Sequence, residues 1–521
     1  MNLDVQHFLA LLPVIALTAA SVIVMLCAAF YRRHLLIATL TLVGLLVSLA
    51  CLQYQAGIPP NEVTPLMVFD RFSVFFMALI LGASAVITVF CYSYFNGRDG
   101  LQEELYILLL TATLGAMVLV SSAHFASFFL GLEILSVSLF AMVAYPVTTL
   151  TRNDGESATP LEAGIKYLIL SGISSAILAL GMAFVYAATG EMNFGSIDKV
   201  LSQSAYSVYA VAGIAMMIAG VGFKLSLVPF HMWTPDVYQG APAPVTAFLS
   251  TVSKSAVLAL ILRGFIALDG YRYESILLGI SLIAIASMLI GNLLALRQNN
   301  IKRLLAYSSI SHSGYILVAF LAAMSVSMRT TGHVDPIALE AVTYYIVTYV
   351  LTTLTAFGVV SVLSSSNHHA GEARDFDRFE DYTSLFWHRP VVASVFTLAL
   401  LSSAGIPLTI GFIGKFYIFA AGVNGALWSL LLVLIVSSGI GLFYYLRLIL
   451  VMFKTESEHA QDPFSAGAMA NSIVDASGGV APLGSRWLIA LLGGLILLLG
   501  VYPSPLMGII RDIVHSMGVG G

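Results

Sequence analysis

Long apolar runs separated by short polar connections fill the chain from one end to the other. A helix needs about 20 residues to cross the roughly 30 Å hydrocarbon core of a bilayer. Fourteen apolar runs come close to that length or exceed it. The pattern therefore predicts fourteen membrane-spanning helices, at residues 8–30, 34–53, 71–95, 102–120, 122–146, 160–189, 205–228, 241–267, 274–296, 303–325, 337–364, 390–424, 427–452 and 486–505.

Composition supports an all-α, polytopic membrane protein. Hydrophobic residues fill 59% of the 521 positions, charged residues only 10%, and the mean hydropathy is +0.93, whereas soluble domains carry about 25% charged residues. The first run has no Lys or Arg before it and no clear small-residue cleavage site. We expect it to remain as a helix and not to be removed as a signal peptide. The net charge of -4 offers no basic stripe for nucleic acid.

The basic residues predict how the chain is oriented. If the loop with Arg32 and Arg33 is cytoplasmic, thirteen of the 23 Lys and Arg residues fall in cytoplasmic loops, six fall on the other side and four are lysines inside spans. An excess of Lys and Arg is typical of cytoplasmic loops. We therefore predict an even number of spans, with both termini on the side of the membrane away from the cytoplasm.

Two predicted spans contain glycine and proline beside a lysine. In the seventh span the break surrounds Lys224 and Pro229, and in the twelfth it surrounds Pro407 and Lys415. Proline removes a helical hydrogen bond, which in the seventh span frees the carbonyl of Leu225. Such breaks at matching positions of two halves indicate ion sites in transporters built from inverted repeats. An ordinary kinked helix is the alternative for either break.

The spans around these breaks fit two five-helix units, helices 4–8 and helices 9–13. Because five is an odd number, successive units must point in opposite directions through the membrane. A Gly-, Ala- and Ser-rich stretch near the end has the composition of a flexible connector. We expect a three-helix region at 1–100, a first repeat at 101–268, a second repeat at 269–454, a flexible cytoplasmic loop at 455–485 and a C-terminal helix at 486–521.

Five charged residues lie inside apolar runs: Glu133, Lys166, Lys224, Lys254 and Lys415. An ionisable side chain in hydrocarbon costs at least ~2.5–3.5 kcal/mol, which packing alone does not explain. A buried lysine can release its proton, whereas arginine stays charged at physiological pH. A buried carboxylate such as Glu133 needs a cation nearby, and Lys224 or Lys166 are the candidates. These residues predict a protein that moves ions, with lysines that exchange protons.

The positions of the lysines within their spans distinguish them. Lys166 follows Glu162 near the start of its helix, so a side chain that reaches the membrane interface is the alternative there. Lys415 lies at the far side of a helix break, where an exit, a second relay and a structural role are all open. Lys254 lies about a dozen residues from either end of its span and is the best candidate for a central relay, beside the hydroxyls of Ser250, Thr251, Ser253 and Ser255.

Two histidines complete the candidate relay. Histidine titrates near neutral pH and can bridge lysines through water. His312 is flanked by serines, which favours a relay, whereas a structural role is at least as well supported for His231. A helix-end anchor at the cytoplasmic face is the interpretation for Asn292, Arg297, Lys302 and Arg303.

No cofactor signature accompanies these residues. The sequence has no P-loop, no dinucleotide fingerprint, no paired histidines placed for two haems and no metal-ligand cluster. We therefore predict that the chain carries no redox cofactor and no metal of its own.

Long segments of the chain resemble a known family. They are FFLGLEILSVSLFAMVAY (128–145), KLSLVPFHMWTPDVYQGAPAPVTAF (224–248), QNNIKRLLAYSSISHSGY (298–315) and LSSAGIPLTIGFIGKF (401–416). The sequence resembles subunit N among the antiporter-like, Mrp-related subunits of proton-pumping NADH:quinone oxidoreductase, respiratory complex I. The resemblance covers nearly the whole chain and is close to proteobacterial members. One sister subunit has a glutamate at the position of Lys415, which favours subunit N.

The resemblance implies a fold and a set of roles. It implies fourteen helices in two inverted five-helix repeats, with helices 7 and 12 broken. In that family the glutamate of helix 5 pairs with the lysine of helix 7, and a change in this pair pushes a proton through a central lysine. The matching residues here are Glu133, Lys224 and, on helices 8, 12 and 6, Lys254, Lys415 and Lys166.

The expected activity is that of a proton-translocating subunit of an NADH:quinone translocase. FMN, iron–sulfur clusters and quinone are expected in partner subunits, and quinone would be contacted only indirectly. The expected partners are other membrane-arm subunits, including an adjacent antiporter-like subunit, and the lipid bilayer. Two alternatives remain: a component of an Mrp-type cation/proton antiporter, and a scaffold of the membrane arm that conducts nothing.

Overall fold

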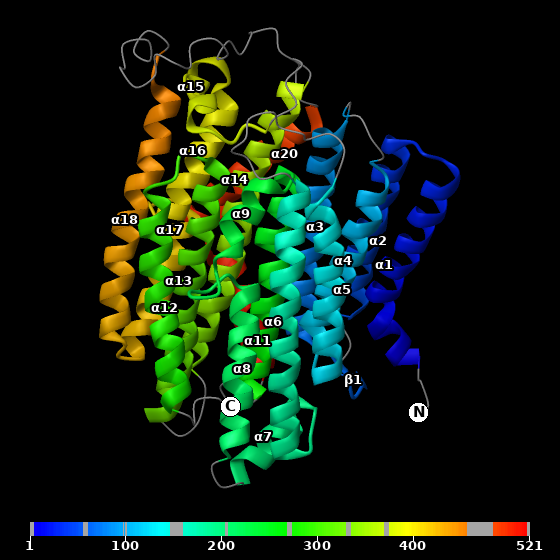
Figure 1. Ribbon diagram of the computed structural model, residues 1–521, viewed down its shortest axis with the longest axis vertical. Coiled ribbons are helices and arrows are strands. Elements are labelled where there is room, and N and C mark those ends of the chain that lie inside the picture. The colour runs from blue at the N-terminus through cyan, green and yellow to red at the C-terminus, as the bar shows by residue number, and fades with distance from the viewer. Residues whose placement is uncertain are drawn as a thin grey trace.

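The computed structural model describes residues 5–55, 61–96, 98, 102–145, 160–203, 207–267, 274–329, 335–368, 375–455 and 483–517. Its long helices run side by side along the long axis (Figure 1). Up to the middle of the chain they are α1 (Val5–Phe30), α2 (His34–Gln55), α3 (Arg71–Phe95), α4 (Glu104–Ser121), α5 (Phe125–Val143), α6 (Pro160–Thr189), α7 (Phe194–Gln203), α8 (Val208–Lys224), α9 (Trp233–Gly240), α10 (Ala243–Phe248), the π-helix η1 (Leu249–Ser253) and α11 (Lys254–Ala267).

The second half of the chain continues this bundle. Its elements are α12 (Glu274–Ala295), α13 (Ile301–Arg329), α14 (Pro336–His368), the 3₁₀-helix η3 (Phe379–Tyr382), α15 (Leu385–His388), α16 (Pro390–Ala404), α17 (Ile410–Asn424), α18 (Trp428–Phe453), α20 (Leu483–Val501) and α21 (Ser504–Ser516).

Twelve helices among the described residues are long and apolar enough to cross a membrane, and α8, α16 and α17 are shorter apolar helices. The prediction of a helical, polytopic membrane protein is therefore confirmed. Most boundaries agree with the hydrophobic runs, and α6 matches its predicted span at both ends. The seventh predicted span, 205–228, ends inside the helix break. α8 stops at Lys224, and the chain becomes helical again in α9, which the prediction did not include.

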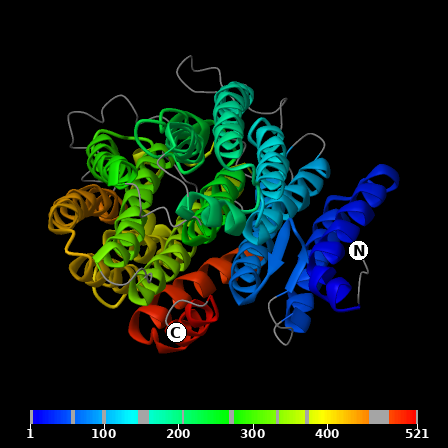
Figure 2. The same cartoon turned by 90° about the horizontal axis from the view of Figure 1, so that it is seen from below.

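The helices differ in what surrounds them. The segments Ala243–Gly264 and Ile301–Met324 are almost entirely buried, whereas α1 and α18 lie at opposite edges of the bundle (Figure 2) and expose apolar side chains. A helix that is apolar on every side yet exposed is typical of a segment that faces lipid. The two central segments carry Lys254 and His312, so these candidate residues lie in the interior.

Two helices are interrupted inside the bundle. The break between α8 and α9 begins directly after Lys224 and includes Ser226, whose φ is 62°. The break between α16 and α17 begins at Gly405, whose φ of 87° is the left-handed conformation that ends many helices and that glycine adopts without penalty. Both interruptions lie next to residues that the sequence singles out.

Several short elements have no counterpart among the predicted spans. Strands β1 (Asn61–Thr64) and β2 (Met67–Phe69) form an antiparallel hairpin, and the carbonyl of Leu66 in its turn accepts bonds from the backbone of Ala123 and the hydroxyl of Ser127. These strands are too short to give a span-length signal. α7 and α21 are short helices with one apolar face, and α21 continues beyond the last span.

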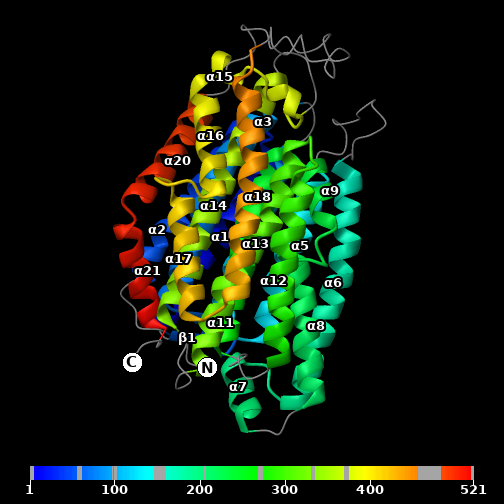
Figure 3. The same cartoon turned by 90° about the vertical axis from the view of Figure 1, so that its left-hand side faces the viewer.

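The two ends of the chain lie on the same side of the molecule. α1 begins and α21 ends toward the lower end of the bundle (Figure 3), as an even number of crossings requires. The predicted flexible loop at 455–485 lies almost wholly outside the described residues, which stop at Thr455 and resume at Leu483.

Candidate functional site

Lys224 is bound by two serine hydroxyls at the end of the first half-helix. It is the last residue of α8 and is 6% exposed. Its Nζ donates to Oγ of Ser136 on α5 at 2.7 Å and to Oγ of Ser171 on α6 at 2.5 Å. A cation at a helix C-terminus also interacts favourably with the helix dipole. The break thus places an ammonium group inside the bundle with neutral partners.

Glu133 lies one helical turn away from this lysine site. Its Oε1 accepts a 2.6 Å hydrogen bond from Ser175. Glu133 and Ser136 are three residues apart on α5, and Ser171 and Ser175 are four apart on α6, so each pair occupies one helix face. Among the described residues Glu133 makes no direct ion pair with Lys224. The structure brings the two residues into one polar cluster with serines between them.

The break after Lys224 is hydrogen-bonded to the second half of the chain. The carbonyl of Leu225, which Pro229 was predicted to free, accepts a 3.2 Å bond from the hydroxyl of Ser313 on α13. The backbone nitrogen of Val228 donates to Ser287 on α12 at 3.0 Å. An interrupted helix in a membrane must satisfy its backbone groups internally, and these contacts do so.

Lys254 lies where a π-helical turn returns to α-helix. The π-helix η1 ends at Ser253, and Lys254 is the first residue of α11, with 1% of its surface exposed. Its Nζ donates to Oγ of Ser309 on α13 at 2.5 Å, and Ser309 shares a 2.8 Å hydrogen bond with Tyr349 on α14. Single π-helical turns are rare and frequently lie at functional sites. Lys254 is thus buried in the interior of the bundle, and its role as a central relay stays a prediction.

His312 lies among tyrosines on α13. Its Nδ1 is 2.7 Å from the hydroxyl of Tyr345, and its Nε2 is 3.5 Å from the hydroxyl of Tyr445. Tyr445 also hydrogen-bonds to Ser308, which is adjacent to the serine that binds Lys254. His312 and Lys254 are thus linked to adjacent serines of α13, His312 to Ser308 through Tyr445 and Lys254 to Ser309 directly.

Lys415 bridges the second helix break. Its Nζ donates to the carbonyl of Ala404, the last residue of α16, and to Oγ of Ser438 on α18, both at 2.8 Å. The carbonyls at the end of a helix lack partners within that helix, so the ammonium group supplies one. The same Nζ lies 5.1 Å from the ring centroid of Tyr315 on α13. Lys415, partly buried, thus occupies a position similar to that of Lys224.

Asn292 belongs to the interior and not to a helix-end anchor, which corrects the sequence interpretation. It is 1% exposed. Its Nδ2 donates to Tyr315 at 3.0 Å and to Ser437 at 2.6 Å, and its Oδ1 accepts from Tyr444 at 2.9 Å. The ring of Tyr315 also faces the ammonium group of Lys415. Asn292, on α12, therefore belongs to the same polar interior as Lys415.

Lys166 lies near the surface of the bundle, which supports the alternative of a side chain that reaches the membrane interface. Its side chain is 42% exposed and forms ion pairs with Glu162 at 2.8 Å and with Asp236 at 3.2 Å. Asp236 also pairs with Arg303 at 2.7 Å.

His231 lies within the first break, between α8 and α9, and is 6% exposed. Its Nδ1 is buried without a hydrogen-bond partner. The structure therefore places His231 beside the break but joins it to none of the other candidate residues by a described hydrogen bond.

Sequence analysis missed a buried ionic cluster around Asp375. Lys302, 2% exposed, donates to Asp375 at 2.7 Å and to the carbonyl of Ala241 at 3.0 Å. Arg98 lies 3.8 Å from the same carboxylate, and Tyr94 donates to it at 2.5 Å. Burial by itself would raise the pKa of the Asp375 carboxyl, but the charges of Lys302 and Arg98 outweigh it and hold the pKa below its usual range. Lys302 is thus paired with a buried carboxylate, unlike Lys224, Lys254 and Lys415.

Lys224, Lys254, His312 and Lys415 have side chains and partners that can exchange protons. Three lysines and a histidine are joined to serine and tyrosine hydroxyls, each of which can accept one proton and donate another. No group of three or more His, Cys, Asp or Glu side chains suited to a metal ion occurs within the residues the structure describes.

Comparison with known sequences identifies the family. The family model described as "NADH:quinone oxidoreductase/Mrp antiporter, TM" matches residues 122–441, which include both helix breaks and every candidate residue. The chain is 45% identical over 522 residues to NADH-quinone oxidoreductase subunit N of Ectopseudomonas mendocina, covering 98% of this chain and 96% of the relative. The chain belongs to the NADH-quinone oxidoreductase subunit N family.

Other members of the subunit N family are equally similar. The protein from Methylococcus capsulatus is 48% identical over 447 residues, covering 85% of this chain and 86% of the relative. The protein from Nitrosospira multiformis is 49% identical over 509 residues, covering 96% and 94%.

Solved structures agree with this assignment. A chain of respiratory complex I from Thermus thermophilus with bound aureothin superposes with a TM-score of 0.74 at 29% identity, covering 95% of this chain and 98% of that one. A chain of the Mrp complex from Dietzia sp. DQ12-45-1b superposes with a TM-score of 0.77 at 21% identity, covering 100% of both chains. The second likeness shows a shared fold alone.

Proposed function

We propose that this chain translocates protons in the membrane arm of NADH-quinone oxidoreductase, along the buried line that Glu133, Lys224, Lys254, His312 and Lys415 define. The observation that carries the proposal is the environment of Lys254. This lysine lies inside the bundle and is almost fully buried. Among the described residues it donates a hydrogen bond to Ser309, which in turn hydrogen-bonds to Tyr349. Burying an ammonium group without a carboxylate partner costs free energy. A site that passes the proton on gives this costly arrangement a function.

The first half supplies a switchable proton donor. Residues on one face of a helix that are three or four apart are about 5–6 Å from each other. A movement of the Lys224 ammonium by that amount, from Ser136 and Ser171 toward Ser175, would bring it against Glu133. An ion pair with Glu133 would stabilise the protonated lysine, and its loss would favour release of the proton.

The second half supplies the continuation. From Lys224 the contact of Leu225 with Ser313 reaches α13, and Ser313 donates to the carbonyl of Ser309, one turn away. From Lys254, hydroxyls on α13, α14 and α18 surround His312 and approach Lys415. We assign Lys254 as the central relay, with His312 and Lys415 beyond it. Lys166 and His231 lie beside the line.

The same proposal extends to the topology. We count α8 with α9 as one interrupted span and α16 with α17 as another. Together with the twelve long apolar helices they make fourteen spans. Helices 4–8 and 9–13 then form the two inverted repeats, within 101–268 and 269–454, after a three-helix region at 1–100. We place both chain ends on the periplasmic side of a bacterial inner membrane.

Electron transfer belongs to other subunits in this proposal. The chain offers a proton path, and FMN, iron–sulfur clusters and quinone would be held by partner subunits whose redox reaction drives it. We place an adjacent antiporter-like subunit among its membrane-arm neighbours, and contact with quinone is indirect.

The test compares Lys254→Ala with Lys199→Ala in the complete enzyme, reconstituted in vesicles. Lys199 is exposed on α7, outside the line, and serves as the matched control. We expect Lys254→Ala to lower the number of protons pumped per NADH oxidised and Lys199→Ala to leave it unchanged. Unchanged pumping in Lys254→Ala would favour the scaffold alternative. Sodium-dependent proton flux without NADH oxidation would favour the Mrp-type alternative.

A further inference from the structure

An apolar groove lies between the two halves of the bundle. α8 packs on α6, and α12 packs on α13, while α11 lies behind the groove that remains between α8 and α12. The groove has about 1080 Å³ of space between side chains, part of it open to the outside. The outer sides of the two flanking helices are exposed and apolar, with Val208 at 71% and Leu278 at 62%. The groove therefore faces the same medium as these residues.

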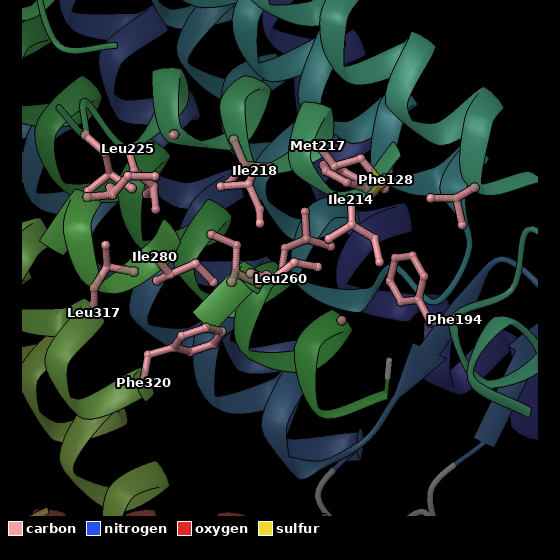
Figure 4. Close-up of a pocket in the computed structure, with 18 of the residues that line it drawn as sticks. Phe128, Phe194, Ile214, Met217, Ile218, Leu225, Leu260, Ile280, Leu317 and Phe320 are labelled. Carbon is pink, nitrogen blue, oxygen red and sulfur yellow. The ribbon is translucent and has the colours of Figure 1, made fainter. Parts of the chain in front are cut away.

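Every residue that lines the groove is apolar. Figure 4 shows Ile218 and Leu260 in the middle, with Leu225 toward one end and Phe194 toward the other. A buried water needs two to four polar partners, which this lining does not provide. The groove is thus suited to a hydrocarbon and not to water or an ion.

The length of the groove is close to the depth of one leaflet of a bilayer. At one end it meets Phe194 and Ile197 on α7, a short helix at the lower end of the bundle (Figure 1), which buries these two residues and exposes Lys199. At the other end it meets Leu225 and Leu227 in the break within the bundle. The part of α8 that lines the groove, Ile214 to Gly222, rises about 12 Å. One leaflet of a roughly 30 Å hydrocarbon core is about 15 Å deep, so the lengths correspond.

We propose that this groove binds one acyl chain of a phospholipid, with the headgroup beside α7 and the end of the chain against the break that follows Lys224. The end of the bound chain contacts Leu225 and Leu227, the apolar residues that follow Lys224 in the break. A quinone would find no hydrogen-bond donor in the lining for its carbonyl oxygens. The site stands independently of the proposed function.

Photo-labelling of the complete enzyme tests the site. The probe is a phosphatidylethanolamine that carries a diazirine at the end of one acyl chain. The complex is reconstituted in vesicles of phosphatidylethanolamine and phosphatidylglycerol that contain the probe. It is then purified and washed in detergent, so that only retained probe is left to label it. We expect label on residues at the inner end of the groove, such as Leu225 and Leu317. Label confined to outward residues such as Leu278 would overturn the proposal.

Two substitutions on one helix provide the matched comparison. Ile280→Trp fills the groove, because Ile280 lines it and is 5% exposed, whereas Leu278→Trp places the same ring on the lipid-facing side. We expect loss of the retained label in Ile280→Trp and no loss in Leu278→Trp. If Ile280→Trp fails to assemble, Gly264→Leu fills the other end, where an added Cβ finds only Phe194 at 3.8 Å.

Two results would contradict the proposal. One is full retention of label in the filled variants. The other is displacement of the phospholipid probe by a long-tailed quinone at equal concentration, which would make the quinone tail the occupant.

Discussion

Buried lysines in this chain fall into two kinds that residue type alone does not separate. Lys302 is held by the carboxylate of Asp375, whereas Lys224 and Lys254 are held by serine hydroxyls. A carboxylate partner stabilises the charged form of a lysine, and a neutral hydroxyl does so much less. The partner therefore distinguishes a structural lysine from a candidate proton carrier.

Ser309 positions Lys254 in this account. Ser309→Ala removes the acceptor that Lys254 shares with Tyr349, and a lost hydrogen bond to a charged group costs about 1.5–3 kcal/mol. We expect fewer protons pumped per NADH, with NADH oxidation by the peripheral subunits intact when an artificial electron acceptor is supplied. Ser309→Thr should restore pumping because it keeps the hydroxyl. Equal pumping in Ser309→Ala and the parent enzyme would remove this role.

Lys166 should be far less sensitive than Lys254. Its two ion pairs are at the surface, where each contributes about 0–1 kcal/mol. We expect Lys166→Ala to retain most of the pumping measured for the parent enzyme in the same vesicle assay. A loss of pumping as large as that in Lys254→Ala would show that Lys166 takes part in proton transfer.

The candidate residues were largely predictable from the sequence, but their surroundings were not. A charge in the middle of an apolar run is visible, which is why Lys254 was placed correctly. The ion pair of Lys166 with Asp236 joins residues 70 positions apart, which a local sequence pattern does not reveal. Asn292 and Lys302 looked like members of a surface anchor because their interior partners lie on distant segments.

At the scale of elements, the second helix break depends on one glycine. Gly405 has a φ of 87°, and an added Cβ would lie 2.8 Å from Cδ of Lys415. Gly405→Ala would therefore strain the backbone by about 1–2 kcal/mol and displace the lysine. We expect lower pumping and a lower melting temperature of the assembled enzyme.

Gly439→Ala is the control for this prediction. Gly439 lies within α18, and an added Cβ would find nothing within 4 Å. We expect no loss of pumping there. Equal effects of the two substitutions would show that the break geometry is not what matters.

The spans themselves were accessible from hydrophobic length because a bilayer sets the length of a helix that crosses it. α6 was predicted without error at either end. The β1–β2 hairpin, α7 and α9 were not, since segments of three to ten residues carry no length signal and owe their structure to neighbouring helices. The π-helix before Lys254 likewise has no signature in the sequence.

Across the whole molecule, the Asp375 cluster ties the loop after α14 to α3 and α13. The pKa of this carboxyl is lower in the folded protein than in the unfolded chain, so its stabilising contribution is present above about pH 4 and is lost as the pH falls through the folded pKa. Asp375→Asn removes the charge between two cations, and breaking a buried pair costs about 3–5 kcal/mol.

Melting of the assembled enzyme between pH 3 and 8 measures this contribution. We expect Asp375→Asn to lower the melting temperature by a constant amount near neutral pH, and the difference should narrow below about pH 4. Glu380→Gln, at an exposed position in the same loop, should have no such effect. A difference that stays the same down to pH 3 would contradict the assignment.

The central claim is that Lys254 passes a proton and does not merely provide a charge. Lys254→Arg separates the two, because arginine keeps the positive charge but does not release its proton at physiological pH. The decisive measurement is the number of protons pumped per NADH oxidised by the complete enzyme carrying Lys254→Arg in sealed vesicles. We predict a loss as large as in Lys254→Ala. Normal pumping with arginine at this position would contradict the account.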